Sequence, residues 1–232
     1  MPELEADGCI YQYDIKGRFI CDCGKTNDDL KYLKESLHGM LRKNFSKESL
    51  GVSYIRMYAH NQIINIIHEF NKLLINKDKE EIFQEFIEKN PLLLAKYHAK
   101  NIFVKPDLLG RFEPDFVILD SRNHLKMIEL EKPSLKLFRK DRQPRQELMH
   151  AFGQVLDWLD EYKRNPDTFL ECLELNRNQI TKVSGVVLAG NSKNEDFKNL
   201  QRFFSQPTYP DIELVTLDEL SNSLLEISKK LL

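Results

Sequence analysis

Acidic side chains gather in one short stretch of the sequence, EPDFVILDSRNHLKMIELEKP at residues 113–133. Two β-rich runs in this stretch are separated by the polar turn DSRNH, which predicts an antiparallel hairpin. In the simplest register of that hairpin, Asp115 lies opposite Glu129. Because side chains alternate between the two faces of a strand, we expect Asp115, Glu129 and Glu131 to share one face.

Several carboxylates on one partly buried face are costly, because like charges repel and burial removes their hydration. A hard divalent cation relieves both costs: Mg²⁺ takes oxygen ligands from one or two carboxylates, keeps several waters and bridges to phosphate. The pattern therefore favours metal-assisted hydrolysis of a phosphodiester bond. The alternative is a solvated strand face lined with glutamate. Partial burial, and hence a site, is favoured by the apolar neighbours Phe116, Ile118, Met127 and Ile128.

The flanking sequence supplies strands and helices that would hold this hairpin. A short amphipathic helix with Asp78 as its expected N-cap stops before Pro91. The segment VSGVVLAG at 183–190 is continuously apolar, which is typical of a strand buried on both faces. Further strands are expected at 102–105, 115–119, 126–130 and 212–217, with helices at about 146–163 and from 217 onward. The sequence therefore predicts an α/β domain over residues 78–232.

Residues 1–77 are expected to form a separate, small α+β region. A glycine-containing turn between two β-rich runs predicts a hairpin, and apolar residues at helical spacing predict two helices. The expected elements are a hairpin of residues 9–13 and 18–23, helices at 28–43 and 60–75, and a polar loop at 46–51. This region carries no recognisable motif, so we expect a regulatory or an oligomerising role.

Composition narrows the class of protein. The 232 residues include 41% hydrophobic and 30% charged side chains, and the net charge is -2, as in an ordinary globular protein. Apolar stretches are far shorter than the ~20 residues of a membrane span, and the acidic start PELEAD is unlike a secretory signal. We therefore expect a cytoplasmic protein that is neither secreted nor membrane-bound. Any contact with nucleic acid must come from a local basic patch or from metal-bridged carboxylates.

The cysteines are few and, in a chain without a secretory signal, suggest reduced thiols. Cys21 and Cys23, with Cys9 nearby, are compatible with a zinc site. One further candidate ligand is too few for a firm assignment, so small thiols in the N-terminal hairpin are the favoured interpretation.

Pro114-Asp115, a hairpin, and Glu129-x-Glu131-Lys132-Pro133 together resemble the PD-(D/E)XK nuclease fold, and specifically the Shedu family of anti-phage nucleases. The resemblance covers about residues 78–220. Other segments occur in the same order as in that family: the helix that ends in Asn90-Pro91, ELMHAFGQVLDW, SGVVLAG and VTLDEL. The resemblance implies a central mixed sheet flanked by helices, and a DNA endonuclease that acts on phage or foreign DNA with Mg²⁺ or Mn²⁺. It also implies a homo-oligomer.

The same resemblance implies roles for individual residues. Asp115, Glu129 and the backbone carbonyl of Leu130 correspond to metal ligands. Glu131 occupies the position of a lysine that, in the superfamily, orients the attacking water. We therefore expect Glu131 to be a third ligand or a general base, assisted by Lys132. The rival is a catalytically inactive module of the same fold that still binds or senses DNA.

Residues near the hairpin have both site and structural interpretations. Glu81 lies three residues after Asp78, so it either completes a capping box or joins the metal site. His150, Gln154 and Trp158 lie four residues apart and form one stripe of the long helix. Gln154 is expected to bind water or phosphate near the metal. Trp158 is expected in the core, and His150 is open between surface and site.

Residues 132–145 carry six basic side chains and one acidic side chain directly after the carboxylate strand. The expected contacts with the DNA backbone are Lys136, Arg139, Lys140, Arg142 and Arg145, which would give salt-dependent, sequence-independent binding. The alternative is a solvated surface loop. A third hypothesis for the whole chain is an interaction protein in which residues 1–77 recognise a partner.

Overall fold

The computed structural model describes the backbone at residues 4–6, 9–13, 19–21, 47–195, 197–204 and 211–230. Side chains are described from residue 59 onward within these ranges, apart from residues 197, 201 and 204. The chain divides into two compact units, residues 1–68 with 225–232, and residues 69–224. None of the helices in the described ranges is long and apolar enough to cross a membrane.

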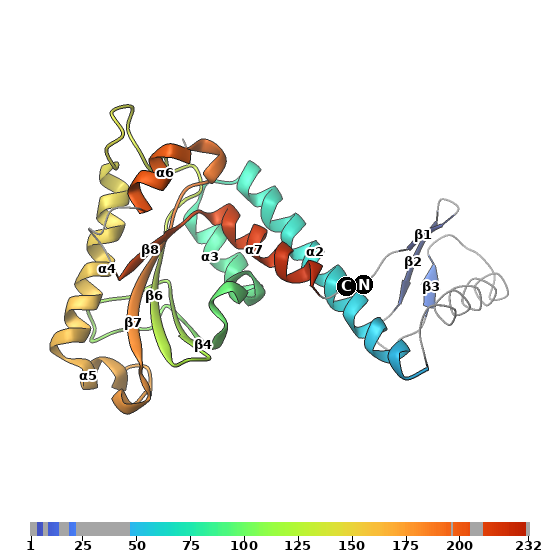
Figure 1. Ribbon diagram of the computed structural model, residues 1–232, viewed down its shortest axis with the longest axis horizontal. Helices are drawn as coiled ribbons and strands as arrows, with labels where there is room; N and C mark the ends of the chain where they lie inside the picture. The colour runs from blue at the N-terminus through green and yellow to red at the C-terminus, as the bar shows by residue number, and fades with distance from the viewer. Residues whose placement is uncertain are drawn as a thin grey trace. The chain divides into compact units, whose positions relative to one another are not determined.

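The N-terminal strands form a three-stranded antiparallel sheet in the order β1-β2-β3 (Figure 1). Its strands are β1 (Leu4–Ala6), β2 (Cys9–Tyr13) and β3 (Phe19–Cys21). Tyr13 pairs with Phe19, which confirms the predicted hairpin, and β1 is an additional strand. The expected helix at 28–43, Cys23 and the cysteine side chains of the zinc alternative lie outside the described residues.

Helix α2 runs from Lys47 to Asn76 and includes the predicted helix at 60–75. The predicted loop at 46–51 is wrong, because α2 already begins at Lys47. Lysine, glutamate and leucine are good helix formers, and a single glycine such as Gly51 is tolerated inside a helix. The polar character of this stretch therefore fitted a helical turn as well as a loop.

The larger unit is built on a five-stranded mixed sheet in the order β4-β5-β6-β7-β8 (Figure 1). Its strands are β4 (Ala99–Val104), β5 (Phe116–Asp120), β6 (His124–Leu130), β7 (Lys182–Leu188) and β8 (Ile212–Val215). The pairs β4-β5 and β5-β6 are antiparallel, whereas β6-β7 and β7-β8 are parallel. The predicted α/β class, with a central mixed sheet between helices, is confirmed.

Helices lie on both sides of this sheet, with α4 on one side and α3 and α7 on the other (Figure 1). The longer helices are α3 (Glu80–Lys89), α4 (Gln146–Arg164), α6 (Phe197–Phe204) and α7 (Leu217–Lys229). Shorter ones are the 3-10 helices η1 (Pro91–Tyr97), η2 (Arg177–Gln179) and η3 (Ser192–Asn194) and the α-helix α5 (Pro166–Glu171). The long helix predicted at 146–163 and the final helix from 217 are thus confirmed.

The alternation of side chains along β5 and β6 sets up two cores. One core joins the sheet to α4 and contains Val117, Leu119, Leu125, Met127, Leu148, Phe152 and Val155, together with the predicted core residue Trp158. On the other face Phe116, Ile118 and Ile128 are fully buried. β7 is buried from Ser184 through Leu188, as its apolar sequence predicted. A Cβ placed on Gly185 would collide with the Val155 side chain, so this glycine allows α4 to approach β7 closely.

The start of α3 differs from the prediction. The N-cap residue is Lys79, in an extended conformation with φ -91° and ψ 126°, and it makes no side-chain capping hydrogen bond. The predicted N-cap at Asp78 is therefore wrong, and the Asp78–Glu81 capping box does not form. The acidic residues of the first turn, Glu80 and Glu81, instead face the positive end of the helix dipole, which stabilises carboxylates there.

Candidate functional site

The hairpin that carries the acidic motif has the predicted register. Phe116 pairs with Ile128 and Val117 with Met127, so the next position, Asp115, falls opposite Glu129. Met127 lies in the core under α4. Because side chains alternate, Glu129 lies on that same α4-covered face.

Asp115 is bound into the hairpin by its own side chain. Its Oδ2 accepts a 2.8 Å hydrogen bond from the Leu130 backbone N–H, and the residue is only 6% exposed. The β5–β6 pairing ends at Phe116 and Ile128, so the carboxylate of Asp115 accepts the Leu130 N–H in place of a strand carbonyl. Burial raises the pKa of Asp115, while the Leu130 hydrogen bond and the charge of Lys105 oppose that rise.

Glu129 is the most perturbed carboxyl of the group. Burial is the main cause that raises its pKa to about 8, and the negative charges of Asp115, Glu80 and Glu131 add to it. A hydrogen bond from the Gln154 side chain on α4 acts in the opposite direction. The structure therefore brings the predicted residues Asp115, Glu129 and Gln154 together at the end of β6.

Glu80 is a member of this carboxylate group that the sequence analysis missed. Burial raises its pKa to about 7, with contributions from the charges of Asp115, Glu131 and Glu81. Glu81, the predicted residue, is exposed. The signal was present in the sequence: Glu80 precedes the buried Phe83, Gln84 and Ile87 by three, four and seven residues, which is the spacing of one helix face.

Glu131 lies just beyond the end of β6 and continues its pairing, since its N–H donates to the Leu188 carbonyl at 2.7 Å. Burial raises its pKa, whereas the nearby charges of His150 and Lys132 lower it. His150 is thus close enough to the carboxylate group to affect it. Lys132 is exposed, and the pairing of β6 with β7 runs through Leu130 without a register shift that would turn Lys132 inward.

Lys105 is a second residue that the sequence analysis missed. It follows β4 with a φ of 42°, and its N–H donates to the Asp115 carbonyl at 3.1 Å. Against burial, which raises the pKa of both Asp115 and Glu80, the positive charge of Lys105 lowers both values. A lysine that directly follows the neighbouring strand therefore acts on Asp115 and Glu80, whereas the charge of Lys132 acts on Glu131.

The carboxylate oxygens of this group are suitable ligands for a hard cation that binds through few protein side chains. Within the described ranges, no three or more His, Cys, Asp and Glu side chains are arranged to hold a metal ion. Magnesium, however, usually binds through one or two carboxylates and keeps several waters. Burial disfavours the ionised forms of Asp115 and Glu129, and the charge of Asp115 adds to this at Glu129. A divalent cation between the two carboxylates would reverse that balance.

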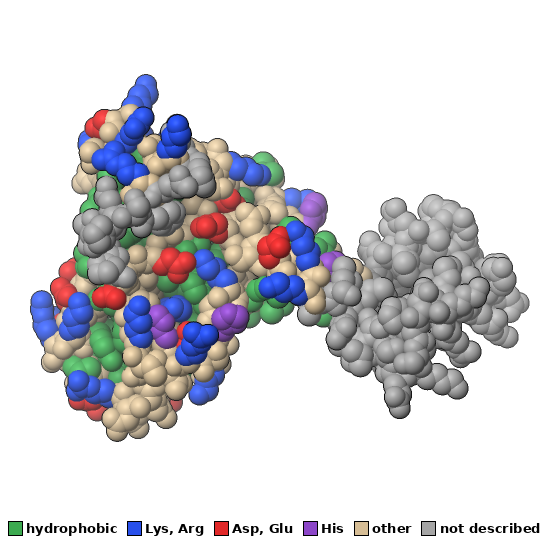
Figure 2. Space-filling model, viewed as in Figure 1, with side chains coloured by type: hydrophobic (Ala, Val, Ile, Leu, Met, Phe, Trp, Pro, Cys, Tyr) green, Lys and Arg blue, Asp and Glu red, His purple; other side chains and the backbone are tan. Residues whose placement is uncertain are grey.

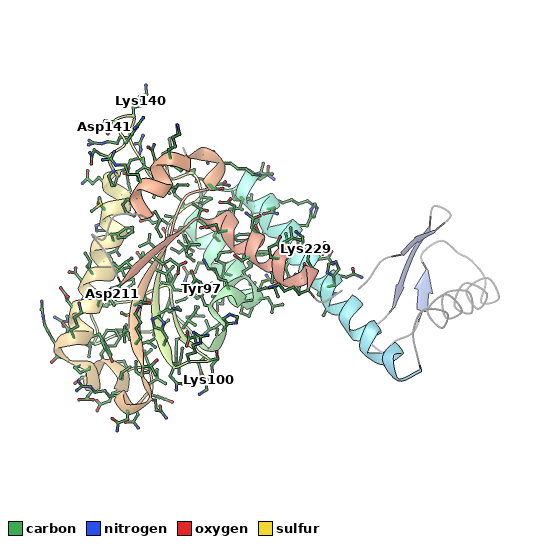
Figure 3. All side chains as sticks on the ribbon, in the orientation of Figure 1. Tyr97, Lys100, Lys140, Asp141, Asp211 and Lys229 are labelled. Atoms are coloured by element: carbon green, nitrogen blue, oxygen red, sulfur yellow. The ribbon has the colours of Figure 1, made fainter. Side chains whose placement is uncertain are left out.

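The basic segment at 132–145 forms a small hairpin rather than an irregular loop. Phe138 and Pro144 form an antiparallel bridge, and the Arg139 N–H donates to the Gln143 carbonyl at 2.8 Å. A turn with Arg142 at φ 66° closes the tip. Figure 3 labels Lys140 and Asp141 at this tip, which projects beyond α4, and Figure 2 shows Lys and Arg side chains gathered there.

The predicted DNA-contact residues differ in their surroundings. Lys136, Lys140 and Arg142 are exposed. Arg139 is exposed too, and it pairs with Asp141 at 3.2 Å. Arg145 is half-buried, and its Nε has no hydrogen-bond partner among the described residues.

The fold and the site define an α/β protein with a carboxylate group at the end of a central β-hairpin, flanked by an exposed basic hairpin. A family model described as the C-terminal part of the Shedu protein SduA matches residues 77–221. The chain therefore belongs to the Shedu SduA C-terminal family, as its motifs suggested, and this membership indicates a role in anti-phage defence. A comparison with curated proteins gave no match.

Proposed function

We propose that this protein is a metal-dependent DNA endonuclease of an anti-phage defence system. The observation that carries the proposal is the convergence of Asp115, Glu129 and Glu80 from two strands and a helix: burial raises all three pKa values, and the charge of Asp115 raises those of Glu129 and Glu80 further. Such an arrangement destabilises the metal-free protein and suits chemistry that needs a bound cation. The fold family, with its role in defence, supports foreign DNA as the substrate.

Asp115 and Glu129 would hold Mg²⁺ or Mn²⁺ together with the Leu130 carbonyl, and Glu131 would complete the site as a ligand or general base. When bound, the ion lowers the pKa of a coordinated water and neutralises charge that develops on the phosphate. Because the Leu130 N–H holds Oδ2 of Asp115, the other oxygen has a fixed direction. The Gln154 hydrogen bond restrains Glu129 in the same way.

Lys105 is our candidate for the positive charge that the motif lacks at Glu131. It lies beside Asp115 through a backbone hydrogen bond, so its side chain starts next to the metal ligands. A cation at that place would stabilise the additional negative charge of a phosphorane-like transition state. Both lysines are exposed, but Lys132 is the weaker candidate because its charge acts on Glu131, whereas that of Lys105 acts on Asp115 and Glu80.

The hairpin at 132–145 is the proposed DNA contact. Its exposed cations Lys136, Lys140 and Arg142 can neutralise backbone phosphates without reading bases. Binding should then weaken steeply with salt, by a slope of about 0.9 in log K per log salt for each phosphate contact. One such site per chain can cut one strand, so we expect a homo-oligomer to bring two sites to a duplex.

A non-cleaving DNA-binding protein is the second candidate, and the presence of Glu131 at the usual lysine position favours it. The two candidates share the basic hairpin and differ in the chemistry at the carboxylates. Cleavage of DNA therefore separates them, while binding of DNA does not.

The test is cleavage of plasmid and linear DNA with Mg²⁺ or Mn²⁺ by the wild type, Glu129→Gln and Glu88→Gln. Glu88 is an exposed residue of α3 and serves as the matched control for a lost carboxylate. We expect cleavage by the wild type and by Glu88→Gln, and a loss of at least a hundredfold in Glu129→Gln. Gel-shift binding without cleavage by any variant would favour the second candidate. Cleavage by Glu129→Gln at the wild-type rate would refute the proposed site.

A further inference from the structure

A second polar cleft lies at the other end of the sheet, where β6 and β7 begin. It has a volume of about 510 Å³ and is lined by residues of η1, of the β5-β6 turn and of the strand ends. The lining includes Lys96, Tyr97, Arg122, His124, Lys126 and Lys182, together with the acids Asp120 and Glu213. Figure 3 labels Tyr97 in this part of the molecule, and Figure 2 shows Lys, Arg and His side chains gathered around it.

This cleft is separate from the carboxylate group. Lys126 and Glu129 are an odd number of residues apart on β6, so they lie on opposite faces of the sheet. His124, at the start of β6, is five residues from Glu129, which corresponds to roughly 17 Å along the strand. The cleft therefore faces away from the proposed nuclease site and from the basic hairpin at 132–145.

The carboxylates of the cleft are already engaged. Glu213 pairs with Lys96 at 3.1 Å. Oδ1 of Asp120 accepts the backbone N–H groups of Arg122 and His124 at 2.8 and 2.9 Å, which is a turn-closing role. Both acids still act on Lys126 through their charge, but neither forms an ion pair with it.

Three cations remain around the cleft without an acidic partner. Among the described residues, none of Arg122, Lys126 and Lys182 forms an ion pair with a carboxylate, although all three line the same cleft. Burial lowers the pKa of Lys126; the negative charges of Asp120 and Glu213 oppose this, and the positive charges of Lys182 and Lys96 add to it. A bound anion would relieve this repulsion.

Two buried hydrogen-bond donors of the cleft also lack an acceptor. Nζ of Lys126 lies 3.0 Å from Nδ1 of His124, and because an ammonium only donates, Nδ1 accepts and Nε2 carries the proton. That Nε2 has no partner among the described residues, and neither does the hydroxyl of Tyr97, a residue only 4% exposed. The Lys96 and Lys126 ammonium groups cover the Tyr97 ring at 5.1 and 5.9 Å from its centre. An anion bound in the cleft would attract the ammonium groups of Lys96 and Lys126. The Tyr97 hydroxyl and Nε2 of His124 could then donate to its oxygens.

We propose that this cleft binds the phosphate group of a small phosphorylated molecule about the size of a mononucleotide. A tetrahedral phosphate offers several acceptor oxygens and a charge near -2, which matches a set of unpaired cations and unpaired donors. The cavity volume lies within the 300–1,000 Å³ that small-molecule sites usually have. Its position away from the basic hairpin argues for a separate small ligand rather than for the DNA substrate.

The test is isothermal titration calorimetry of the full chain in a phosphate-free buffer, with inorganic phosphate, AMP, adenosine and a thymidine oligonucleotide that has a 5′-hydroxyl. We expect phosphate and AMP to bind and adenosine to give no heat. Lys182→Gln, at an exposed position, and Lys126→Met should each weaken AMP binding about tenfold, since each removes a charged contact. Lys100→Met is the matched control: Lys100 is exposed on β4 and lies outside the cleft lining, so AMP binding should be unchanged.

Three results would overturn the proposal. The first is the absence of heat with both phosphate and AMP while the wild type shows its normal melting transition. The second is equal weakening by Lys100→Met and Lys182→Gln, which would indicate a general charge effect. The third is binding of the oligonucleotide with the same dependence on Lys126 and Lys182, which would make the cleft a nucleic-acid contact. Lys182→Gln keeps the test valid if Lys126→Met, at a half-buried position, fails to fold.

Discussion

Glu129 should make the stability of the metal-free protein fall as the pH rises. Burial and the neighbouring carboxylates raise its pKa from 4.5 to about 8 in the folded protein, whereas the unfolded chain has no such shift. The folded state therefore binds the proton more tightly, so its stability is greatest below pH 4.5 and is lost progressively up to pH 8. At 1.36 kcal/mol per pKa unit, the loss between pH 5 and pH 8 is about 3–4 kcal/mol.

The assay is thermal unfolding of wild type and Glu129→Gln at a series of pH values in the presence of a chelator. For a unit of this size 1 kcal/mol corresponds to about 2–4 °C, so the wild type should lose roughly 10 °C relative to the variant between pH 5 and pH 8. Comparing the two proteins removes the contribution of other groups, such as His124, whose pKa burial lowers. Glu88→Gln, at an exposed position of α3, should keep the wild-type dependence.

Metal binding should offset the loss of unfolding free energy that the ionisation of Glu129 causes. Mg²⁺ binds the ionised carboxylates of the folded state, so it should restore the melting temperature of the wild type at pH 8 and leave that of Glu129→Gln nearly unchanged. Parallel curves for wild type and Glu129→Gln across the whole pH range would refute the reasoning, because they would mean that Glu129 ionises as easily in the folded protein as in the unfolded chain.

Lys105→Met should lower the rate of DNA nicking at least tenfold by removing a charge beside the scissile phosphate, while Lys132→Met stays within about twofold; equal effects would contradict the assignment of Lys105. Gly185→Ala should lower the free energy of unfolding by about 1–3 kcal/mol in urea denaturation, because the new methyl group meets Val155. An unchanged urea midpoint would show that α4 can move away from β7. Tyr97→Phe should raise the free energy of unfolding by about 1 kcal/mol, since it removes a buried hydroxyl without an acceptor. A loss of stability would mean that this hydroxyl is hydrogen-bonded.

Local patterns predicted the central hairpin well. The turn at 120–124 is short, and the alternation of polar and apolar residues allows one register, so the pairing of Phe116 with Ile128 followed from the sequence. The position of Glu80 could also have been predicted, because it shares the helix face of Phe83 and Ile87. The adjacent Glu81 was named instead, with a capping box to Asp78 as its alternative role, and that capping box does not form.

Features that depend on long-range pairing could not be predicted. Lys105 reaches the carboxylates only because β4 pairs with β5, and no local pattern in the sequence specifies that partner. The polar cleft at the start of β6 and β7 combines Tyr97 of η1, Lys126 of β6 and Lys182 of β7, which are up to 85 residues apart (182 minus 97). Residue types at these positions are ordinary when considered one by one, and their proximity follows from the strand order alone.

The hydrogen bond from Leu130 to Asp115 changes how mutations at this aspartate should be interpreted. One carboxylate oxygen closes the end of the hairpin, so Asp115→Ala would leave a buried N–H without an acceptor as well as removing a metal ligand. Loss of activity in that variant would therefore mix misfolding with chemistry. Asp115→Asn separates the two roles, because its amide oxygen can still accept the Leu130 N–H while its NH₂ group cannot bind a cation. An Asn variant that melts like the wild type and does not cleave would assign the second oxygen to catalysis.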